Sequence, residues 1–135
     1  AFTARKTFVM NIPAYSLLIA CLLPIVAAGM QKWGARDYDN HNPRQWAQHM
    51  EDPRRQRALA AQANSWEALI VFAASLLFAL HAKLDPSLRD SLCVIFIVAR
   101  LVYLAAYYYD KALLRSMIWF VGFGSSLALI GKSIA

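Results

Sequence analysis

The chain has 135 residues, of which 59% are hydrophobic and 16% charged, and it carries a formal net charge of +6. The apolar residues are gathered in long runs, which predicts a protein with several membrane spans and argues against a soluble domain. A positive charge can indicate a nucleic-acid partner, but no basic stripe interleaved with aromatic residues lies outside the apolar runs. We therefore expect no nucleic-acid partner, and we expect the cations to face lipid headgroups.

Four apolar runs follow one another along the chain, at about residues 12–34, 58–82, 88–109 and 112–134. Each is close to the ~20 residues that cross ~30 Å of hydrocarbon. Residues 35–57 form the one long polar loop, and the pairs Asp85-Pro86 and Asp110-Lys111 mark short turns. The pattern predicts an all-α membrane protein, a four-helix bundle in a single domain covering residues 1–135. Residues 1–9, which precede Met10, have the character of an upstream extension.

The four spans place the long loop and the Asp110-Lys111 turn on the same side of the membrane. That side carries Lys32, Arg36, Arg44, Arg54, Arg55, Arg57, Lys111 and Arg115, and the other carries Arg5, Lys6, Lys83, Arg89 and Lys132. By the positive-inside rule, residues 35–57 and 110–111 are expected to be cytoplasmic. Trp33 and Trp119, near span ends, are expected in the interfacial aromatic belt.

Two charged residues, Glu67 and Arg100, fall inside apolar spans, where an unpaired charge is expensive. Glu67 lies ten residues after Arg57, and Arg100 lies ten residues before Asp110. Both are therefore expected ~15 Å along their helices, at the same depth. One interpretation is structural: a buried ion pair of these two residues, with Asn64 as amide partner, that specifies helix packing.

The polar residues around these two charges form one stripe on each helix. The first stripe comprises Arg57, Asn64 and Glu67, and the second comprises Arg100, Tyr103 and Tyr107. Gln62 falls off the first stripe. The functional interpretation is a polar cavity open to the cytoplasm, in which Arg57, Arg100 and Arg115 bind an anionic ligand and tyrosines donate hydrogen bonds. The histidines and cysteines have no metal-ligand spacing, so we expect no metal site.

Three motifs stand in and near these stripes: Arg57-x4-Gln62-Ala63-Asn64-Ser65-Trp66-Glu67, Arg100-x2-Tyr103-x3-Tyr107 and Arg115-Ser116. Together with the four spans and the long first loop, they resemble the MAPEG superfamily, the membrane-associated proteins of eicosanoid and glutathione metabolism. The segment Tyr38-Asp39-Asn40-x2-Pro43-Arg44 resembles the small bacterial members.

The resemblance implies a homotrimer, surrounded by lipid in the bacterial inner membrane, with glutathione bound as co-substrate between neighbouring subunits. Arg57, Gln62, Asn64 and Glu67 would organise the glutathione pocket, while Arg100, Tyr103 and Tyr107 would reach the tripeptide from the adjacent subunit. Arg115 would be catalytic, because a guanidinium near a thiol lowers its pKa and favours the nucleophilic thiolate. The implied activity is that of a transferase or peroxidase acting on lipophilic electrophiles or lipid hydroperoxides.

Two departures from the eicosanoid-metabolising members leave a second hypothesis open. Ala60 stands where those proteins carry a second glutathione-binding arginine, and Ala68 stands where a tyrosine is common. The alternative is a noncatalytic membrane subunit with the same fold, acting in lipid packing or beside a larger membrane complex.

Overall fold

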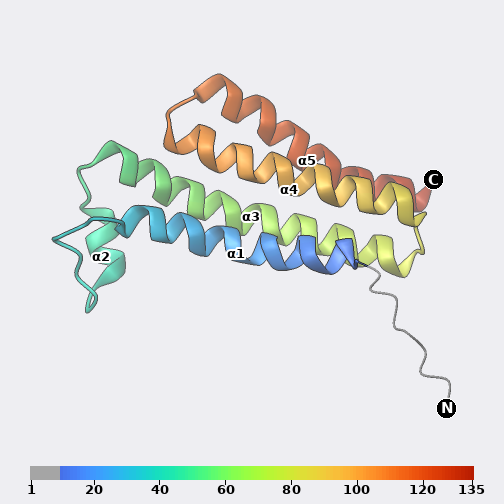
Figure 1. The fold of residues 1–135 in the computed structure, drawn as a ribbon, viewed down its shortest axis with the longest axis horizontal. Helices are drawn as coiled ribbons and strands as arrows, with labels where there is room; N and C mark the ends of the chain where they lie inside the picture. The colour runs from blue at the N-terminus through green and yellow to red at the C-terminus, as the bar shows by residue number, and fades with distance from the viewer. Residues whose placement is uncertain (1–9) are drawn as a thin grey trace, which may run out of the picture.

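The computed structural model describes residues 10–135, so the expected extension at residues 1–9 lies outside the described part. Five helices form in residues 10–135: α1 (Ile12–Lys32), α2 (Pro43–Gln48), α3 (Pro53–His81), α4 (Pro86–Tyr108) and α5 (Ala112–Ile134). Of these, α1, α3, α4 and α5 are long and apolar enough to cross a membrane, whereas α2 is a short helix inside the long loop (Figure 1). The predicted all-α fold with four membrane-length helices is confirmed for the described residues.

The helices begin where short polar side chains and prolines favour a start. Asn11, Asp52 and Asp85 each accept a hydrogen bond from a backbone N–H in the first turn of α1, α3 and α4, at 3.2, 2.9 and 3.0 Å. Each of these helices has a proline in its first turn, where the missing N–H costs no intrahelical hydrogen bond. The Asp52 cap starts α3 at Pro53, within the segment expected to be loop, and five residues before the predicted residue 58.

The helix ends are set by residues in the left-handed backbone region. Gly34, with a φ of +67°, follows the end of α1, where a residue without a Cβ adopts this conformation at little cost. Asp110 has a φ of 59° and forms the tight turn that joins α4 to α5. This turn holds the two helices side by side and antiparallel (Figure 1).

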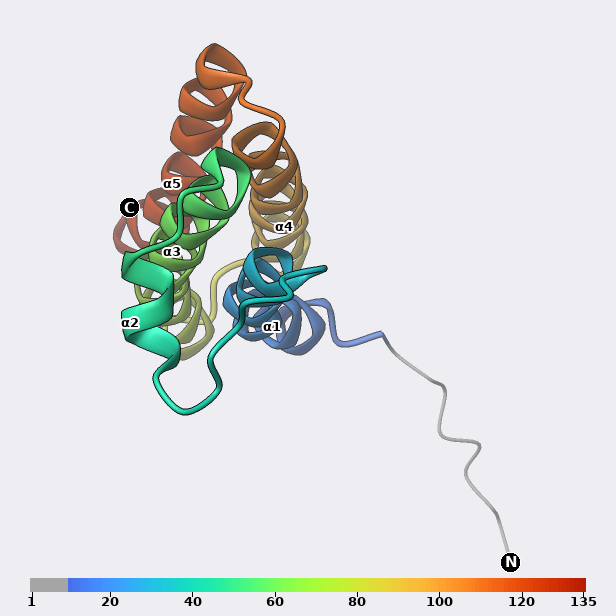
Figure 2. The same cartoon turned by 90° about the vertical axis from the view of Figure 1, so that its left-hand side faces the viewer.

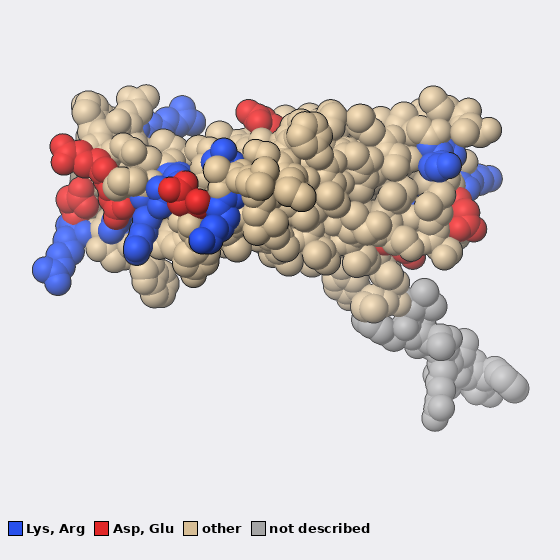
Figure 3. All heavy atoms as spheres, turned by 90° about the horizontal axis from the view of Figure 1, so that it is seen from above, with Lys and Arg blue, Asp and Glu red and all other residues tan. Residues whose placement is uncertain are grey.

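The four long helices form a bundle in which α1 packs against α3, and α4 packs against α5 (Figure 2). The long loop, with α2, and the α4–α5 turn lie at the same end, as the alternation of four spans predicts. Charged side chains gather at that end, while the middle of the face in Figure 3 is almost free of them. The distribution of charge is that of a membrane-spanning bundle. The end with α2 carries most of the cations, together with five carboxylates, and is called the cationic end below.

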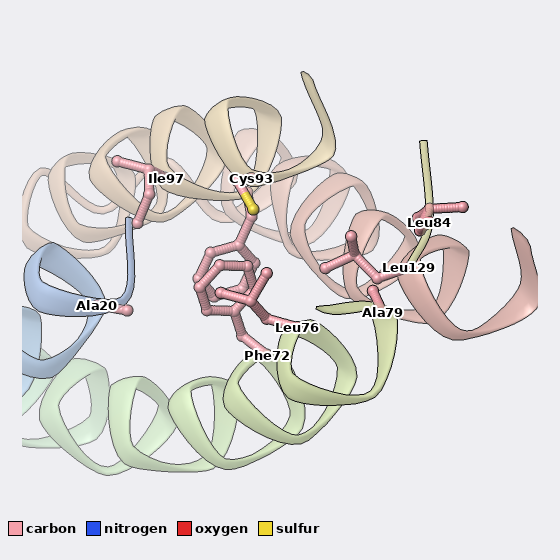
Figure 4. Packing of buried hydrophobic residues seen from close by; sticks show 9 residues of the cluster. Ala20, Phe72, Leu76, Ala79, Leu84, Cys93, Ile97 and Leu129 are labelled. Atoms are coloured by element: carbon pink, nitrogen blue, oxygen red, sulfur yellow. The ribbon is translucent and has the colours of Figure 1, made fainter. Parts of the chain in front are cut away.

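The larger hydrophobic cluster occupies the half of the bundle away from α2, and a smaller one joins α1 to α4 in the half nearer α2. Phe72 of α3 and Phe96 of α4 stack with ring centroids 3.9 Å apart and planes 2° from parallel. Leu76, Cys93 and Leu129 pack around them, and all are fully buried (Figure 4). The core therefore joins α3, α4 and α5 directly below the level of Glu67 and Arg100.

Candidate functional site

Arg100 is the centre of a polar cluster between α3 and α4, with only 3% of its surface exposed. Its Nη1 donates to Asn64 Oδ1 at 2.9 Å, and its Nη2 donates to Ser65 Oγ at 3.4 Å. The guanidinium carbon also lies 4.2 Å from the centroid of the Tyr103 ring. α3 and α4 therefore bring Asn64, Ser65 and Arg100 together in the middle of apolar helices.

The contacts of Arg100 contribute enough free energy to offset the cost of placing its charge inside the membrane. Placing an arginine at the centre of a span costs ~2.5–3.5 kcal/mol on the insertion scale. A hydrogen bond to a charged group contributes ~1.5–3 kcal/mol, and a cation–π contact adds ~0.5–2 kcal/mol. Two bonds and the ring contact therefore offset the cost, although Nε of Arg100 is buried without a hydrogen-bond partner in residues 10–135. Arg100 is thus held in place by the protein itself.

Glu67 does not form the ion pair with Arg100 that the structural interpretation expected. Its side chain is exposed on the surface of the single chain, and its Oε2 accepts from Asn64 Nδ2 at 3.2 Å. Within residues 10–135, no cation lies within 4.0 Å of the Glu67 carboxylate, so Arg100 is linked to it only through Asn64. The reason is angular: three residues advance a helix by about 300°, which turns Glu67 about 60° away from the face of Asn64.

A polar cavity of about 290 Å³ lies above Arg100, towards the cationic end. It is lined by Asn64, Tyr103, Tyr107, Arg115, Ser116, Trp119 and Phe120. The guanidinium carbon of Arg115 lies 4.5 Å from the centroid of the Tyr107 ring, and the rings of Tyr103 and Tyr107 meet edge to face at 5.6 Å. No carboxylate in residues 10–135 forms an ion pair with Arg115. The cavity therefore offers an uncompensated cation and two phenolic hydroxyls to a ligand.

A second, smaller cavity of about 90 Å³ lies one to two helical turns deeper. It is lined by Asn64, Glu67, Ala68, Val71, Phe96, Arg100, Trp119, Gly122, Phe123 and Ser126. Asn64 and Trp119 line both cavities. The site is therefore a column between α3, α4 and α5, polar near the cationic end and mainly apolar below.

Two of the predicted residues lie away from this column. Gln62 faces α1, where its Oε1 accepts from Gln31 Nε2 at 2.5 Å. Arg57 donates to the backbone oxygen of Tyr108 at 3.4 Å and lies 3.9 Å from the Asp110 carboxylate. Gln62 is off the stripe, as predicted, and Arg57 joins the ends of α3 and α4 instead of lining either cavity.

A family model described as the MAPEG family matches residues 12–135. The chain belongs to the MAPEG family. No curated protein matches the chain. The match covers all four long helices, which confirms the resemblance drawn from the motifs and makes this an integral membrane protein of the eicosanoid and glutathione metabolism type.

In this MAPEG chain, the α3 and α4 stripes meet within one protomer. Asn64 and Arg100 of the same chain are hydrogen-bonded, so bringing these two residues together requires no neighbouring subunit. The position of Trp119 was not anticipated beyond the aromatic belt, yet it lines both cavities. Its spacing was a usable signal, because it follows Arg115 by four residues and so lies one turn along the same face of α5.

Proposed function

We propose that this MAPEG protein is a glutathione-dependent transferase or peroxidase that acts on lipophilic electrophiles or lipid hydroperoxides. The observation that carries the proposal is the polar cavity in which Arg115 has no carboxylate partner in residues 10–135 and stands beside Tyr103 and Tyr107. An unpaired guanidinium at the edge of the hydrocarbon attracts an anion. A thiolate is an anion that such a cation stabilises without titrating itself.

The proposed reaction requires two things of the chain: a cation that stabilises the thiolate, and hydrogen-bond donors beside it. Arg115 would hold glutathione as its thiolate, and the tyrosine hydroxyls would donate to the peptide or to a developing negative charge. In a transfer reaction, the sulfur forms a bond to the electrophilic carbon. In a peroxidase reaction, the sulfur takes the terminal hydroperoxide oxygen, which releases an alcohol and leaves a sulfenic acid. A second glutathione then gives the disulfide and water.

The remaining predicted residues fit the proposal if the protein is a homotrimer. Glu67 is an exposed carboxylate in the middle of α3, where contact with lipid would be costly, and a neighbouring copy would cover it. Gln62 and Arg57, which lie away from the column of their own chain, would then contribute to glutathione binding between neighbouring subunits. We further propose the bacterial inner membrane as the location, with the cationic end in the cytoplasm.

The direct test is titration of the purified protein with glutathione while the thiolate absorbance is followed. The native protein is expected to give a saturable signal at neutral pH. Arg115→Ala is expected to lose most of that signal, and Arg115→Lys to keep part of it, because the charge remains without the planar fork. Lys132→Ala, which removes a cation at the opposite end of the bundle, is the matched control and is expected to behave as native.

The second candidate function is that of a noncatalytic MAPEG subunit, and Ala60 and Ala68 favour it because they supply no polar ligand atoms. A folded native protein without a saturable thiolate signal would support this candidate and refute the enzyme proposal. The native mass in mild detergent tests the assembly: a stable monomer or dimer would contradict the homotrimer, and an additional chain would identify a larger complex.

A further inference from the structure

An open groove lies between the start of α1 and the start of α4, in the half of the bundle away from α2 (Figure 1). It is lined by Ile12 of α1 and by Ser87, Asp90, Ser91, Val94 and Ile95 of α4. The groove has a volume of about 550 Å³, and none of its lining residues lines either cavity of the candidate site. It is therefore a separate feature of the fold.

The groove crosses from the headgroup level of one leaflet to the level of the acyl chains. Its α4 residues follow one another at spacings of one, three and four, which places them on one face of the helix. Asp90 is four residues after Pro86, the first residue of α4, and so lies ~6 Å along the helix. Val94 and Ile95 lie one turn deeper and are 47% and 44% exposed. The groove is thus polar near the membrane surface and apolar below.

Asp90 forms an ion pair with its neighbour Arg89 through only one carboxylate oxygen. Nε and Nη2 of Arg89 both lie 2.9 Å from Asp90 Oδ1. Among residues 10–135, no donor bonds to Asp90 Oδ2, and no acceptor bonds to Arg89 Nη1. Both side chains are partly exposed. The pair is neutral as a whole, yet it offers one negative and one positive group to an occupant.

Two hydroxyl groups stand on the same face as the Asp90 carboxylate. Ser91 Oγ donates to the backbone oxygen of Ser87 at 2.8 Å, so its own lone pairs are available as acceptors. The groove therefore offers three oxygen acceptors, which are Asp90 Oδ2 and the two serine hydroxyls. A primary ammonium has three N–H donors, as the lysine side chain does, whereas a quaternary ammonium has none.

The apolar part of the groove continues along α4 towards the middle of the membrane. Val98 and Leu101 follow Val94 at spacings of four and three, and both are exposed. No charged residue lies between Asp90 and Arg100 in the sequence, and Arg100 is buried on another face. An occupant that meets the whole surface therefore has a polar head and an apolar tail.

We propose that this groove binds a phospholipid with a primary-amine headgroup, of the phosphatidylethanolamine class. The ammonium bonds to Asp90 Oδ2 and the serine hydroxyls, the phosphate meets Arg89, and an acyl chain lies on Val94 and Ile95. A zwitterionic headgroup fits the neutral pair better than an anionic one, because Asp90 repels a net negative charge. The site is independent of the proposed glutathione-dependent function.

The test is native mass spectrometry of the full chain in mild detergent, titrated with one lipid at a time. The probes are dioleoyl phosphatidylethanolamine, its N-methyl and N,N-dimethyl derivatives, and dioleoyl phosphatidylcholine. All four share the phosphate and the acyl chains, and they differ in the number of N–H donors. Affinity should fall along this series, and phosphatidylethanolamine should bind at least about tenfold more tightly than phosphatidylcholine.

Two further probes separate the sources of affinity. Dioleoyl phosphatidylglycerol, which carries a net negative charge, should bind more weakly than phosphatidylethanolamine. Glycerophosphoethanolamine has the same headgroup without acyl chains, and it should bind at least about tenfold more weakly than the lipid, because it buries no apolar surface in the groove.

Substitutions in the groove should remove the preference for the primary amine. Asp90→Asn should weaken phosphatidylethanolamine binding about tenfold and leave phosphatidylcholine binding as in the native protein. Asp110→Asn makes the same change at the cationic end and is the matched control, expected to behave as native. The double variant Ser87→Ala/Ser91→Ala keeps the ion pair and should also reduce the preference. The helical circular dichroism signal of each variant is compared with that of the native protein, so that unfolding is detected.

Several results would overturn the proposal. Equal affinity of the native protein for phosphatidylethanolamine and phosphatidylcholine would show that the N–H donors are not recognised. Tighter binding of phosphatidylglycerol would show a site for anions. A full preference in folded Asp90→Asn and in the double serine variant would place the bound lipid elsewhere. An oligomer that retains no phosphatidylethanolamine would show that another copy of the chain covers the groove.

Discussion

Replacing Asn64 by leucine tests the claim that the protein's own contacts hold Arg100 in the membrane. The substitution removes the acceptor of the 2.9 Å bond from Arg100 Nη1 and leaves only the longer bond to Ser65. A hydrogen bond to a charged group contributes ~1.5–3 kcal/mol, so we expect the free energy of unfolding to fall by about 2 kcal/mol. Leucine also removes the 3.2 Å hydrogen bond from Asn64 Nδ2 to the Glu67 carboxylate, and the loss of that bond adds to this value.

The measurement is denaturant unfolding in detergent micelles, followed by the helical circular dichroism signal at one protein concentration. Gln45→Leu removes an exposed amide from α2 and is the matched control, expected within about 0.5 kcal/mol of native. The double variant Asn64→Leu/Arg100→Met should lose less than the sum of the single losses, since replacing both partners leaves no unpaired charge. Strictly additive losses, or an Asn64→Leu protein as stable as native, would refute the reasoning.

Further predictions follow from the core, the helix contacts and the caps. Phe72→Ala should lower the free energy of unfolding by about 3–5 kcal/mol in the same assay, because the ring is fully buried and stacked on Phe96; a loss below about 1 kcal/mol would contradict this packing. Gln31→Leu should cost about 1–2 kcal/mol by leaving Gln62 without its partner, and the double variant with Gln62→Leu should recover part of the loss. Arg57→Ala should cost less than about 1 kcal/mol, since its ion pair with Asp110 is long and partly exposed; a larger loss would show a stronger helix-end contact. The hydrogen bond from the backbone N–H of Arg54 lowers the pKa of the Asp52 carboxyl in the folded protein. The ionised cap therefore stabilises α3 at every pH above the pKa of the unfolded state. This contribution is lost as the pH falls through the lower pKa of the folded state. In thermal unfolding between pH 7 and pH 2, Asp52→Asn should therefore lose less stability on acidification than native protein, and an equal loss would exclude the cap as a source of the pH dependence.

The sequence was sufficient for the four long helices because their apolar runs match the thickness of a membrane and are separated by polar turns. It was less informative for α2, which is too short to show a period, although Pro43 at its start is a usual helix signal. The apolar run that predicts the second span begins at residue 58, after α3 does, because the first turn of α3 is polar. Asp52 and Pro53 carry the usual signal of a helix start, and α3 begins there.

The sequence was sufficient to predict how deep the polar residues lie along their helices, but not the directions in which their side chains point. Counting residues from the helix ends placed Glu67 and Arg100 at the same level, since the rise per residue is fixed. The direction of a side chain depends on how two helices are rotated against each other, and that depends on packing over the whole interface. For this reason Asn64, and not Glu67, receives the hydrogen bond from Arg100. The spacing of four residues from Arg115 places Trp119 on the same face of α5, but its contact with both cavities also depends on how α5 packs against α3 and α4.

The order of the polar residues along the chain has a consequence for biogenesis. Asn64 and Ser65 are on α3, which is synthesised before α4 and its Arg100. A nascent chain that enters the bilayer from its N-terminus therefore has the acceptors in place before the costly guanidinium arrives. In the reverse order, Arg100 would enter the hydrocarbon before its hydrogen-bond acceptors on α3. A circular permutant in which α4 precedes α3 is therefore expected to insert poorly into the membrane.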